Sequence, residues 1–509
     1  IMKKLGKVIS VLLAAVMLMA VCVYAEPAAQ EESVLRIGTT TEGTGNIGVP
    51  WSATGQSAKA TVPGVDTLVE MDKEGNVLPS LAQEWDIDGN VITFRLRDDV
   101  VFHDGTPFNA EAAKWNMDQW TTNPFCAAGN EIESVEIIDD YTIAVTLKQF
   151  STGFFSNLTL SYFGFISPTA YEENGQEWCE ANLVSTGPFK LESINPGSGW
   201  VYVKNEDYWG DGPYIDRLEY TVNTNSSTLK LMLESNEIDM ILWDSDGDAE
   251  IKSTLEAEGY ELMGYQIGGE PTVFFPSSLD EDSPLSDVRV RQAVDYAIDK
   301  ETIAMIGNGY WNAAYQLVGE QNPYYKAENV RSFDQDKAKE LLAEAGYPDG
   351  FSMTIYVEEN ADMNVIVAMQ AYLDMVGIKA DIVINSQNDQ FGMAMGGWSN
   401  GYLLANIPVE VNYLSGASGY LAQDAGKFVS VDKSDEMNAM IYDGLGQPSL
   451  ADAASYTEEF IQYVFDEAVV MPMYISEKTL GAKASYVKDD NVGYLGKGDW
   501  TPQSCYIEK

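Results

Sequence analysis

The stretch from residue 185 to residue 243 decides the fold, because it holds a strand–helix–strand unit in the middle of the chain. It begins Ser185-Thr186-Gly187-Pro188-Phe189-Lys190-Leu191, where a Gly-Pro turn leads into Val201-Tyr202-Val203, which is typical of a strand. It ends Leu229-Lys230-Leu231-Met232-Leu233-Glu234-Ser235-Asn236-Glu237-Ile238-Asp239-Met240-Ile241-Leu242-Trp243. The apolar spacing predicts a helix and then an alternating strand. No residue of the stretch forms a catalytic motif, so we interpret it as scaffold.

Before this stretch the pattern is also α/β. Val34-Leu35-Arg36-Ile37-Gly38 predicts the first strand, and the loop after it carries Thr41 and Glu42. Loops that leave the carboxyl ends of strands often contact ligands, although this loop is equally well explained as a connection. Residues 66–150 predict a compact unit with two alternating strands and a helix capped by Asn109.

After residue 270 the pattern predicts a second α/β region. Ser286 or Asp287 is expected to cap one helix, and Asp334 another. Residues 351–384 read as strand, helix and strand, which predicts two parallel strands with a right-handed crossover. A helix near 450–465 and a strand at 469–475 follow. Two such regions with a crevice between them suit ligand capture by hinge closure.

Composition excludes several classes of function. The chain has 509 residues, of which 45% are hydrophobic, and a formal net charge of −48. It can therefore bury large cores, and its surface repels phosphate backbones and anionic lipids. The charge keeps an exported protein soluble; a bias toward cationic or neutral ligands is the alternative reading.

Cysteine and histidine offer little chemistry. There are four cysteines without metal-ligand spacing, and the sequence leaves open whether Cys126 and Cys179 pair. The only histidine, His103, lies in a turn-rich segment, and we expect it to make structural hydrogen bonds rather than to serve a catalytic triad. We predict no metal and no cofactor.

The first residues predict export. Three lysines precede the apolar segment Val8–Val23, and Val23-Tyr24-Ala25 permits cleavage before Glu26. Lipid attachment at Cys22 is the less favoured alternative. The protein is expected outside the cytoplasm, in the periplasm or on the outer face of the cell membrane.

A series of short motifs, in order along the chain, carries a family resemblance. They are Asp66-Thr67-Leu68-Val69, Leu81-Ala82-Gln83-Glu84-Trp85, Phe102-His103-Asp104-Gly105-Thr106-Pro107-Phe108, Thr186-Gly187-Pro188-Phe189, Asn205 to Trp209, Glu237-Ile238-Asp239, Asp287-Val288-Arg289-Val290-Arg291-Gln292-Ala293 and Gly396-Gly397-Trp398. The chain resembles the extracytoplasmic solute-binding proteins of ABC importers, in the peptide- and nickel-binding group known as family 5.

The resemblance implies an α/β fold of two lobes, a type II (cluster C-like) periplasmic-binding-protein fold with mixed sheets. It also implies an extra subdomain in the first lobe. The expected divisions are a signal peptide at 1–25, a tether at 26–33, first-lobe segments at 34–65, 183–269 and 470–509, the extra subdomain at 66–182 and the second lobe at 270–469. Such proteins are receptors, not enzymes; they close on a solute and pass it to the membrane subunits of a permease.

One departure bears on the ligand. Peptide binders of the family hold the peptide's amino terminus with an acid shortly after the Gly-Trp motif. Here Trp398-Ser399-Asn400-Gly401-Tyr402 and the residues to Asn406 contain no acid. A buried ammonium needs a carboxylate, so an oligosaccharide or another organic solute gains weight beside a peptide. Nickel binding is disfavoured by the single histidine.

Seven residues are expected to contact the solute. Trp398 offers a ring for stacking, and Asn400 and Tyr402 follow it in the same loop. Trp243 and Asp244 stand at the end of the strand that starts at Ile238. Thr41 and Glu42 complete the set, and Glu42 or Asp244 could replace the missing ammonium anchor. Each of these residues has an ordinary packing or surface role as its alternative.

The leading hypothesis is thus a monomeric receptor that captures a peptide, an oligosaccharide or another small solute by hinge closure and delivers it to an ABC permease. Nucleic acid is not expected as a partner. The alternatives are a secreted glycoside hydrolase with paired carboxylates, for which no motif singles out a pair, and a solute sensor that does not serve transport.

Overall fold

The computed structural model describes residues 32–40, 45–52, 59–72, 76–123, 127–243, 249–264, 270–320, 322–359, 361–407, 412–476, 479–489 and 500–508. The predicted signal peptide, the tether up to residue 31, Cys22 and Cys126 lie outside these ranges. Within them, no helix has both the length and the apolar character to cross a membrane.

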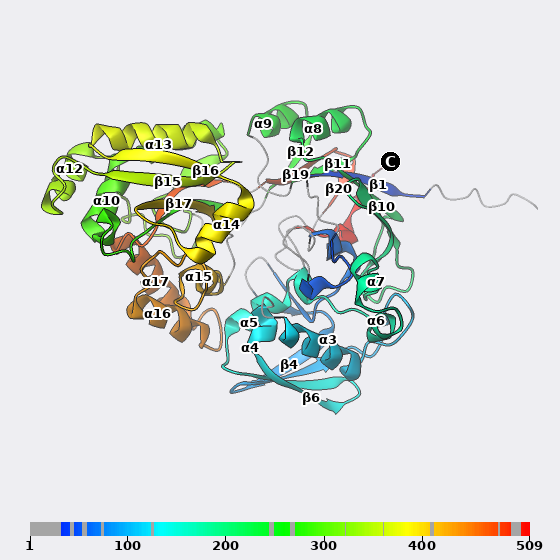
Figure 1. Ribbon diagram of the computed structural model, residues 1–509. Coiled ribbons are helices and arrows are strands. Elements are labelled where there is room, and N and C mark those ends of the chain that lie inside the picture. The colour runs from blue at the N-terminus through cyan, green and yellow to red at the C-terminus, as the bar shows by residue number, and fades with distance from the viewer. Residues whose placement is uncertain are drawn as a thin grey trace, which may run out of the picture.

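A seven-stranded mixed sheet forms the first lobe (Figure 1). Its strands, in spatial order, are β12 (Glu261–Gly264), β19 (Thr479–Lys483), β11 (Met240–Leu242), β1 (Val34–Thr39), β10 (Arg217–Val222), β9 (Gly199–Lys204) and β8 (Phe189–Asn195). β1 runs parallel to both β10 and β11, so the carboxyl ends of these three strands meet at one edge. Helices α8 (Ser226–Glu234) and α9 (Ala249–Ala257) pack over β11.

A six-stranded sheet forms the second lobe. Its order is β14 (Trp311–Ala313), β18 (Met471–Ser476), β13 (Glu270–Pro276), β17 (Gly401–Asn406), β15 (Ser352–Glu358) and β16 (Lys379–Asn385). One face packs on α10 (Val288–Ala297), α12 (Gln335–Glu344) and α13 (Met363–Met375). The other face packs on α14 (Gln387–Gly396), α15 (Tyr413–Leu421), α16 (Asp435–Leu445) and α17 (Ala454–Asp466). Both faces of the sheet are therefore buried, as is usual for a sheet that contains parallel strands.

The chain passes from one sheet to the other twice, after Gly264 and after Ser476. On one side of the crossings Gly264 pairs with Thr479, and on the other side Glu270 pairs with Ser476. The strand pair β12–β19 thus leads into the strand pair β13–β18, which is the connection expected of two lobes that move about a hinge.

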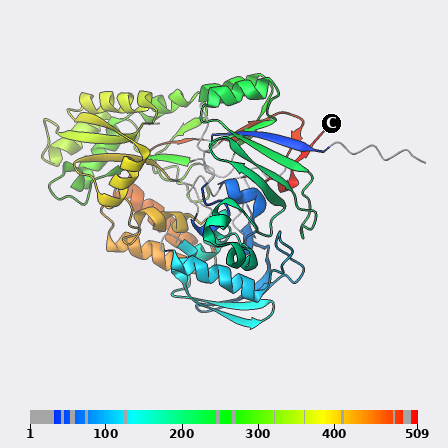
Figure 2. The ribbon, with the colours of Figure 1, turned by 45° about the vertical axis from the view of Figure 1, so that its right-hand side comes forward.

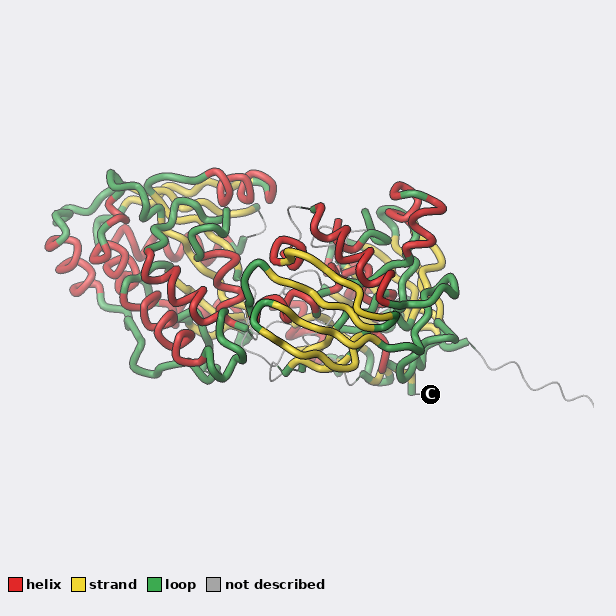
Figure 3. Tube along the Cα trace, turned by 90° about the horizontal axis from the view of Figure 1, so that it is seen from below, coloured by secondary structure: helices red, strands yellow, loops and turns green. Residues whose placement is uncertain are grey.

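A four-stranded antiparallel sheet stands apart from these two. It has the order β4 (Ala82–Asp88), β5 (Val91–Leu96), β7 (Thr142–Leu147) and β6 (Ile132–Asp139), and it lies nearest the viewer in Figure 3. Helix α3 (Ala110–Thr122) covers its inner face with Met117 and Trp120, and Asn109 caps the helix as predicted. The extra subdomain, which lies within the range expected at 66–182, continues with α4 (Ala127–Glu131), α5 (Thr152–Leu158), α6 (Pro168–Asn174) and α7 (Gln176–Ala181).

The central stretch, residues 185–243, holds the extra subdomain to the first sheet. A side chain at Gly187 would place its Cβ 2.4 Å from the carbonyl carbon of Gly64, so the Gly-Pro turn needs glycine for this close approach of two backbones. Asn205 is buried and donates to the Gly187 carbonyl at 3.0 Å. The motifs around Gly187 and Asn205 are therefore packing features, as predicted.

His103 belongs to the same junction. Its Nδ1 accepts from the Ser185 amide at 3.2 Å, so Nε2 carries the proton and donates to the Gly187 carbonyl at 3.0 Å. Desolvation lowers the pKa of His103 to about 4. The single histidine is a structural one, as the sequence predicted.

Asp239 joins the first strand to the C-terminal part of the chain. Its buried carboxylate accepts from the backbone amide of Arg36 at 2.8 Å, from the Arg36 guanidinium at 2.9 and 2.6 Å, and from the Tyr486 hydroxyl at 2.8 Å. Four donors satisfy the charge, as a buried carboxylate requires.

Arg291 plays a comparable part in the second lobe. Its guanidinium, which is buried, donates to the carbonyls of Leu285, Ser286, Glu467 and Ala468 at 2.7–3.0 Å. It therefore caps the C-terminal end of α17 and links this end to the start of α10, which Asp287 caps.

One detail differs from the sequence-based expectation. The chain returns to the first sheet at β19, later than the boundary expected at residue 470, because β18 pairs with β13 in the second sheet.

The sequence left open whether Cys179 forms a disulfide. Cys179 is buried with a free thiol, and burial raises the pKa of that thiol.

Replacing Asp239 tests the first junction. Asp239→Asn should lower the free energy of unfolding by about 2–4 kcal/mol, since it removes a charge that four donors share and leaves the guanidinium of Arg36 without its partner. Urea denaturation measures the change. Glu237→Gln, two residues away and exposed, is the matched control and should change stability by less than about 0.5 kcal/mol. Equal effects of the two substitutions would contradict this role.

His103 predicts a pH dependence. The unfolded chain takes up a proton near pH 6.5, whereas the folded chain resists it until about pH 4, so the free energy of unfolding should fall as the pH falls through this range. The loss due to this group is about 1–3 kcal/mol. His103→Gln should remove this part of the pH dependence, as measured by urea titrations between pH 7 and pH 4. A variant with the slope of the wild type would refute the assignment.

Candidate functional site

In both sheets, parallel strands end beside the connection between the two lobes. In the first lobe, Thr39 ends β1 beside Leu242 at the end of β11, which in turn pairs with β19 next to the crossing. In the second lobe, Asn406 ends β17 opposite Thr272, two residues after the crossing at Glu270. Such edges are where α/β proteins bind ligands. The crevice between the lobes is therefore the place for a site.

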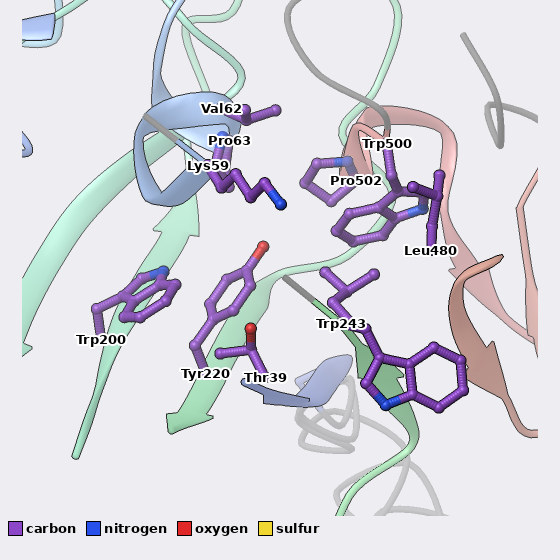
Figure 4. Close-up of a pocket in the computed structure, with 11 residues that line it drawn as sticks. Thr39, Lys59, Val62, Pro63, Trp200, Tyr220, Trp243, Leu480, Trp500 and Pro502 are labelled. Atoms are coloured by element: carbon purple, nitrogen blue, oxygen red, sulfur yellow. The ribbon is translucent and has the colours of Figure 1, made fainter. Parts of the chain in front are cut away.

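A pocket opens at this edge of the first lobe and holds about 580 Å³ of space, part of it open to solvent (Figure 4). The described residues that line it come from seven separate segments of the chain. They are Thr39, Lys59, Val62, Pro63, Trp200, Tyr220, Leu242, Trp243, Leu480, Trp500 and Pro502.

Two aromatic rings form one wall. Trp200 in β9 and Tyr220 in β10 are directly paired across the antiparallel strands, and their rings stack with centroids 4.7 Å apart and an interplanar angle of 17°. Cross-strand aromatic pairs of this kind stabilise a sheet. Gly199 precedes Trp200 with φ of 148°, and a Cβ there would lie 1.8 Å from the Tyr220 carbonyl oxygen, so glycine permits the close pairing.

The wall that carries Lys59 is held by the central stretch. The Tyr202 hydroxyl donates to the Ala60 carbonyl at 2.9 Å, and the Gly187 amide donates to the Gly64 carbonyl at 3.2 Å. These two contacts fix the turn that contains Val62 and Pro63. Residues 185–243 thus hold the turn that carries Val62 and Pro63 in place, although they are not part of that turn.

Trp243 and Trp500 complete the lining on the side of the crossing. The Trp243 amide donates to the Leu480 carbonyl at 2.8 Å, which fixes Trp243 beside the start of β19. The indole nitrogen of Trp500 donates to the carboxylate of Asp489. Both indoles are almost fully buried, with 5% and 6% of their surface exposed.

The lobes also touch away from the crossings. The Thr152 hydroxyl, at the start of α5, donates to the Leu445 carbonyl at 3.3 Å and accepts from the Asn412 amide nitrogen at 3.2 Å. Figures 1 and 2 both show α5 beside the helices of the second lobe. The extra subdomain therefore contacts the second lobe at the far side of the crevice.

The structure places four of the seven predicted contact residues. Trp243 lines the pocket, in agreement with its predicted position at the end of a strand. Thr41, Glu42 and Asp244 lie outside the described residues, although their chain neighbours Thr39 and Trp243 line the pocket.

The other three residues belong to the second lobe and are not brought near Trp243. Trp398 packs against Phe428 with 7% of its surface exposed, and its indole donates to the Gly401 carbonyl at 3.2 Å. Asn400 has φ of 42° and donates to the Ser352 carbonyl at 2.9 Å. Tyr402 is buried against Phe274.

The reason for this placement is strand direction. Asn400 and Gly401 stand at the amino end of β17, beside the amino end of β15, whereas the crevice lies at the carboxyl ends. The sequence predicted a Gly-flanked loop after Trp398 and did not indicate the direction of the strand that follows. The residue that ends β17 is Asn406, whose carbonyl side chain accepts from the Thr272 hydroxyl at 3.0 Å.

Of the eleven described lining residues, only Trp243 was predicted from the sequence. Among the ten others, Lys59, Trp200, Tyr220 and Trp500 have charged or aromatic side chains. The alternation of apolar and polar residues in β9 and β10 is typical of half-buried strands. This pattern could have indicated Trp200 and Tyr220 from the sequence. Lys59 and Trp500 lie in irregular segments with no periodicity, so only the folded chain brings them together.

The described residues contain no cluster of three or more histidine, cysteine, aspartate or glutamate side chains that could hold a metal ion. His103 is bonded to backbone groups, as described above.

Comparisons with known proteins agree with this geometry. The family model described as bacterial extracellular solute-binding proteins, family 5 Middle, matches residues 76–419. The glutathione-binding protein GsiB of Salmonella typhi is 30% identical over 332 residues, which span 62% of this chain and 62% of that protein, less than two thirds of its length.

Solved structures share the fold. The periplasmic binding protein DppA of Helicobacter pylori, in complex with the peptide STSA, superposes with a TM-score of 0.79 at 23% identity and covers 94% of this chain and 98% of its own. NikA of Brucella suis, in complex with Fe(III)-EDTA, gives a TM-score of 0.78 at 21% identity and covers 92% and 98%. The two-lobed periplasmic-binding-protein fold expected from the sequence is confirmed.

The contact between α5 and the second lobe gives a prediction. A Cβ at Gly153 would lie 3.0 Å from the Ser415 hydroxyl oxygen, so Gly153→Val should push the extra subdomain away from α15. Small-angle scattering should then show a larger radius of gyration without added solute.

Gly419→Val is the matched control, because Gly419 lies in α15 with open space around it. Its scattering profile should equal that of the wild type. A Gly153→Val protein with unchanged dimensions would show that this contact does not hold the lobes.

Proposed function

The chain belongs to the bacterial extracellular solute-binding proteins of family 5, and from this premise we propose that it is the solute receptor of an ABC importer. It captures a small organic solute between its lobes by hinge closure and delivers it to the membrane subunits of a permease. It works outside the cytoplasm as a monomer, and it is not an enzyme.

The observation that carries the proposal is the position of the pocket. It lies in the first lobe at the carboxyl ends of β1 and β11, next to the crossings between the lobes. The described lining belongs to the first lobe, so a solute bound there lies beside the connection about which the second lobe closes. Binding free energy then offsets the entropy lost when the two lobes become ordered about it, which is how a ligand shifts a two-state equilibrium.

The relatives indicate the range of solutes. GsiB is described as glutathione-binding, and the solved DppA and NikA structures hold a tetrapeptide and an iron chelate. These solutes are small and polar, and two of them are peptides. We therefore propose that this chain binds an organic solute of this size. The solute is a short peptide or another compound such as an oligosaccharide.

Two measurements on the whole protein test the function. Native mass spectrometry of the protein as purified should reveal a retained solute, or one taken up from a panel of di- to tetrapeptides and oligosaccharides. Small-angle scattering with and without that solute should show compaction. A protein that takes up no member of the panel and never compacts would refute the receptor function.

Two tryptophans separate binding from packing. Trp243→Ala should weaken solute binding by about 10- to 100-fold, because it removes a large ring from the pocket, and should also lower the free energy of unfolding, because the same ring is part of the core under α8. Trp398→Ala should instead lower the free energy of unfolding by about 3–5 kcal/mol, since its ring packs against Phe428. Titration calorimetry and urea denaturation of both variants provide the comparison. The opposite pattern would remove Trp243 from the site.

A further inference from the structure

Three polar side chains of the described pocket lining already interact with other groups of the chain. The indole nitrogen of Trp500 donates to the carboxylate of Asp489. Thr39 and Lys59 take part in interactions of their own. A solute in the pocket therefore gains most from those polar groups of the lining that are not yet paired, because no existing bond has to be replaced there.

The indole nitrogen of Trp200 is such a group. Trp200 lines the pocket with 2% of its surface exposed, and its Nε1 has no hydrogen-bond partner among the described residues. An indole N–H donates and cannot accept, so only an acceptor atom can satisfy it. A buried donor without an acceptor costs free energy, which an oxygen atom of a bound solute recovers. Trp243 has a second unpaired indole nitrogen, but its ring is part of the core under α8.

The hydroxyl of Tyr220 is the second group. Only 8% of Tyr220 is exposed, and no described residue forms a hydrogen bond with its hydroxyl. Burial raises the pKa of Tyr220, so the hydroxyl keeps its proton at neutral pH. It is therefore a neutral donor in the same wall as Trp200.

The two donors belong to one rigid unit. Trp200 and Tyr220 are paired across β9 and β10, and their rings stack with an interplanar angle of 17°. Figure 4 shows the indole nitrogen and the hydroxyl on the same side of this stacked pair, the side toward Val62 and Pro63. Because strand pairing already fixes both rings, the donors lose little freedom when a solute binds.

The surroundings of the two donors are largely apolar. The aliphatic side chains of the described lining are Val62, Pro63, Leu242, Leu480 and Pro502. Such walls favour an apolar part of a solute, and a hydrogen bond formed among them is stronger than one formed in water. Both donors are neutral, so they compensate a carbonyl oxygen, which has two lone pairs and no full charge.

We propose that Trp200 and Tyr220 determine which solute is held, because the indole N–H and the phenol O–H donate to an uncharged carbonyl oxygen whose apolar neighbour fills the pocket. This assignment rests on the proposed receptor function and names the solute class of that same site. Amides, esters and ketones flanked by an apolar chain or ring have this chemistry.

Two uncharged probes test the class, the ketone 4-phenyl-2-butanone and the hydrocarbon n-butylbenzene. They share the ring and the length of the chain, and they differ in the carbonyl oxygen. Neither probe has a charge, so ionic groups around the pocket favour neither of them. Titration followed by intrinsic tryptophan fluorescence, with three tryptophans in the described lining, measures the affinity of each probe. Infrared difference spectra should show the carbonyl stretch of the bound ketone at a lower frequency than in an alkane solvent.

Single substitutions assign the donors. Tyr220→Phe keeps the stacked ring and should weaken binding of the ketone about fivefold, while binding of n-butylbenzene stays nearly unchanged. Trp200→Phe removes the N–H and part of the ring, so the ratio of ketone affinity to hydrocarbon affinity should fall about threefold. In both variants the carbonyl stretch of the bound ketone should move to a higher frequency.

Each substitution has a matched control. Tyr214→Phe makes the same change at an exposed tyrosine outside the described lining. Trp120→Phe makes it at a buried indole in α3, whose nitrogen also has no hydrogen-bond partner among the described residues but which does not line the pocket. Neither control should change the ratio of the two affinities. Urea denaturation of each variant checks that it is folded.

The outcomes separate the solute class from the receptor function. The class is wrong if the ketone does not bind at millimolar concentration, if Tyr220→Phe weakens both probes equally, or if the ratio is unchanged in both pocket variants. If such a protein still retains another solute and compacts around it, the receptor function stands. A protein that never compacts around any solute counts against the receptor function itself.

Discussion

The carboxylate of Asp239 is the interaction on which the binding edge of the first lobe depends. A carboxylate this deeply buried is tolerated only when donors surround it, and here Arg36 and Tyr486 supply all of them. Those donors come from β1 and from the chain after β19. Satisfying one charge therefore fixes the register of β1 against β11 and the path of the C-terminal segment. The ends of these elements are where Thr39, Trp243 and Leu480 line the pocket.

Much of the fold was predictable because its signals are local. The side chains of Asn109, Asp287 and Asp334 cap helices as expected, and the parallel pair β15–β16 around α13 matches the predicted crossover. The pocket was not predictable in the same way. Lys59, Tyr220 and Trp500 are far apart in the sequence, and no periodicity links them. Trp398 shows a second limit of prediction from sequence. A motif can locate a strand, but only the folded sheet shows which end of that strand lies toward the other lobe.

The acidic surface and the largely apolar pocket act at different distances. A net charge of −48 acts on charged solutes in solution, but at physiological ionic strength its effect fades over about 8 Å. Inside the pocket, the aromatic and aliphatic side chains of the described lining act at contact distance. The overall charge then governs solubility and the rate of encounter, while the few residues of the lining govern which group is held.

The pocket also has a consequence for biogenesis. Its walls join Thr39 near one end of the described chain to Trp500 and Pro502 near the other. A chain still emerging from the ribosome lacks those last walls however much of its first sheet has formed. The pocket is therefore complete only after residue 502 has been synthesised and has joined the first sheet, so any chain that ends before this residue lacks part of the pocket.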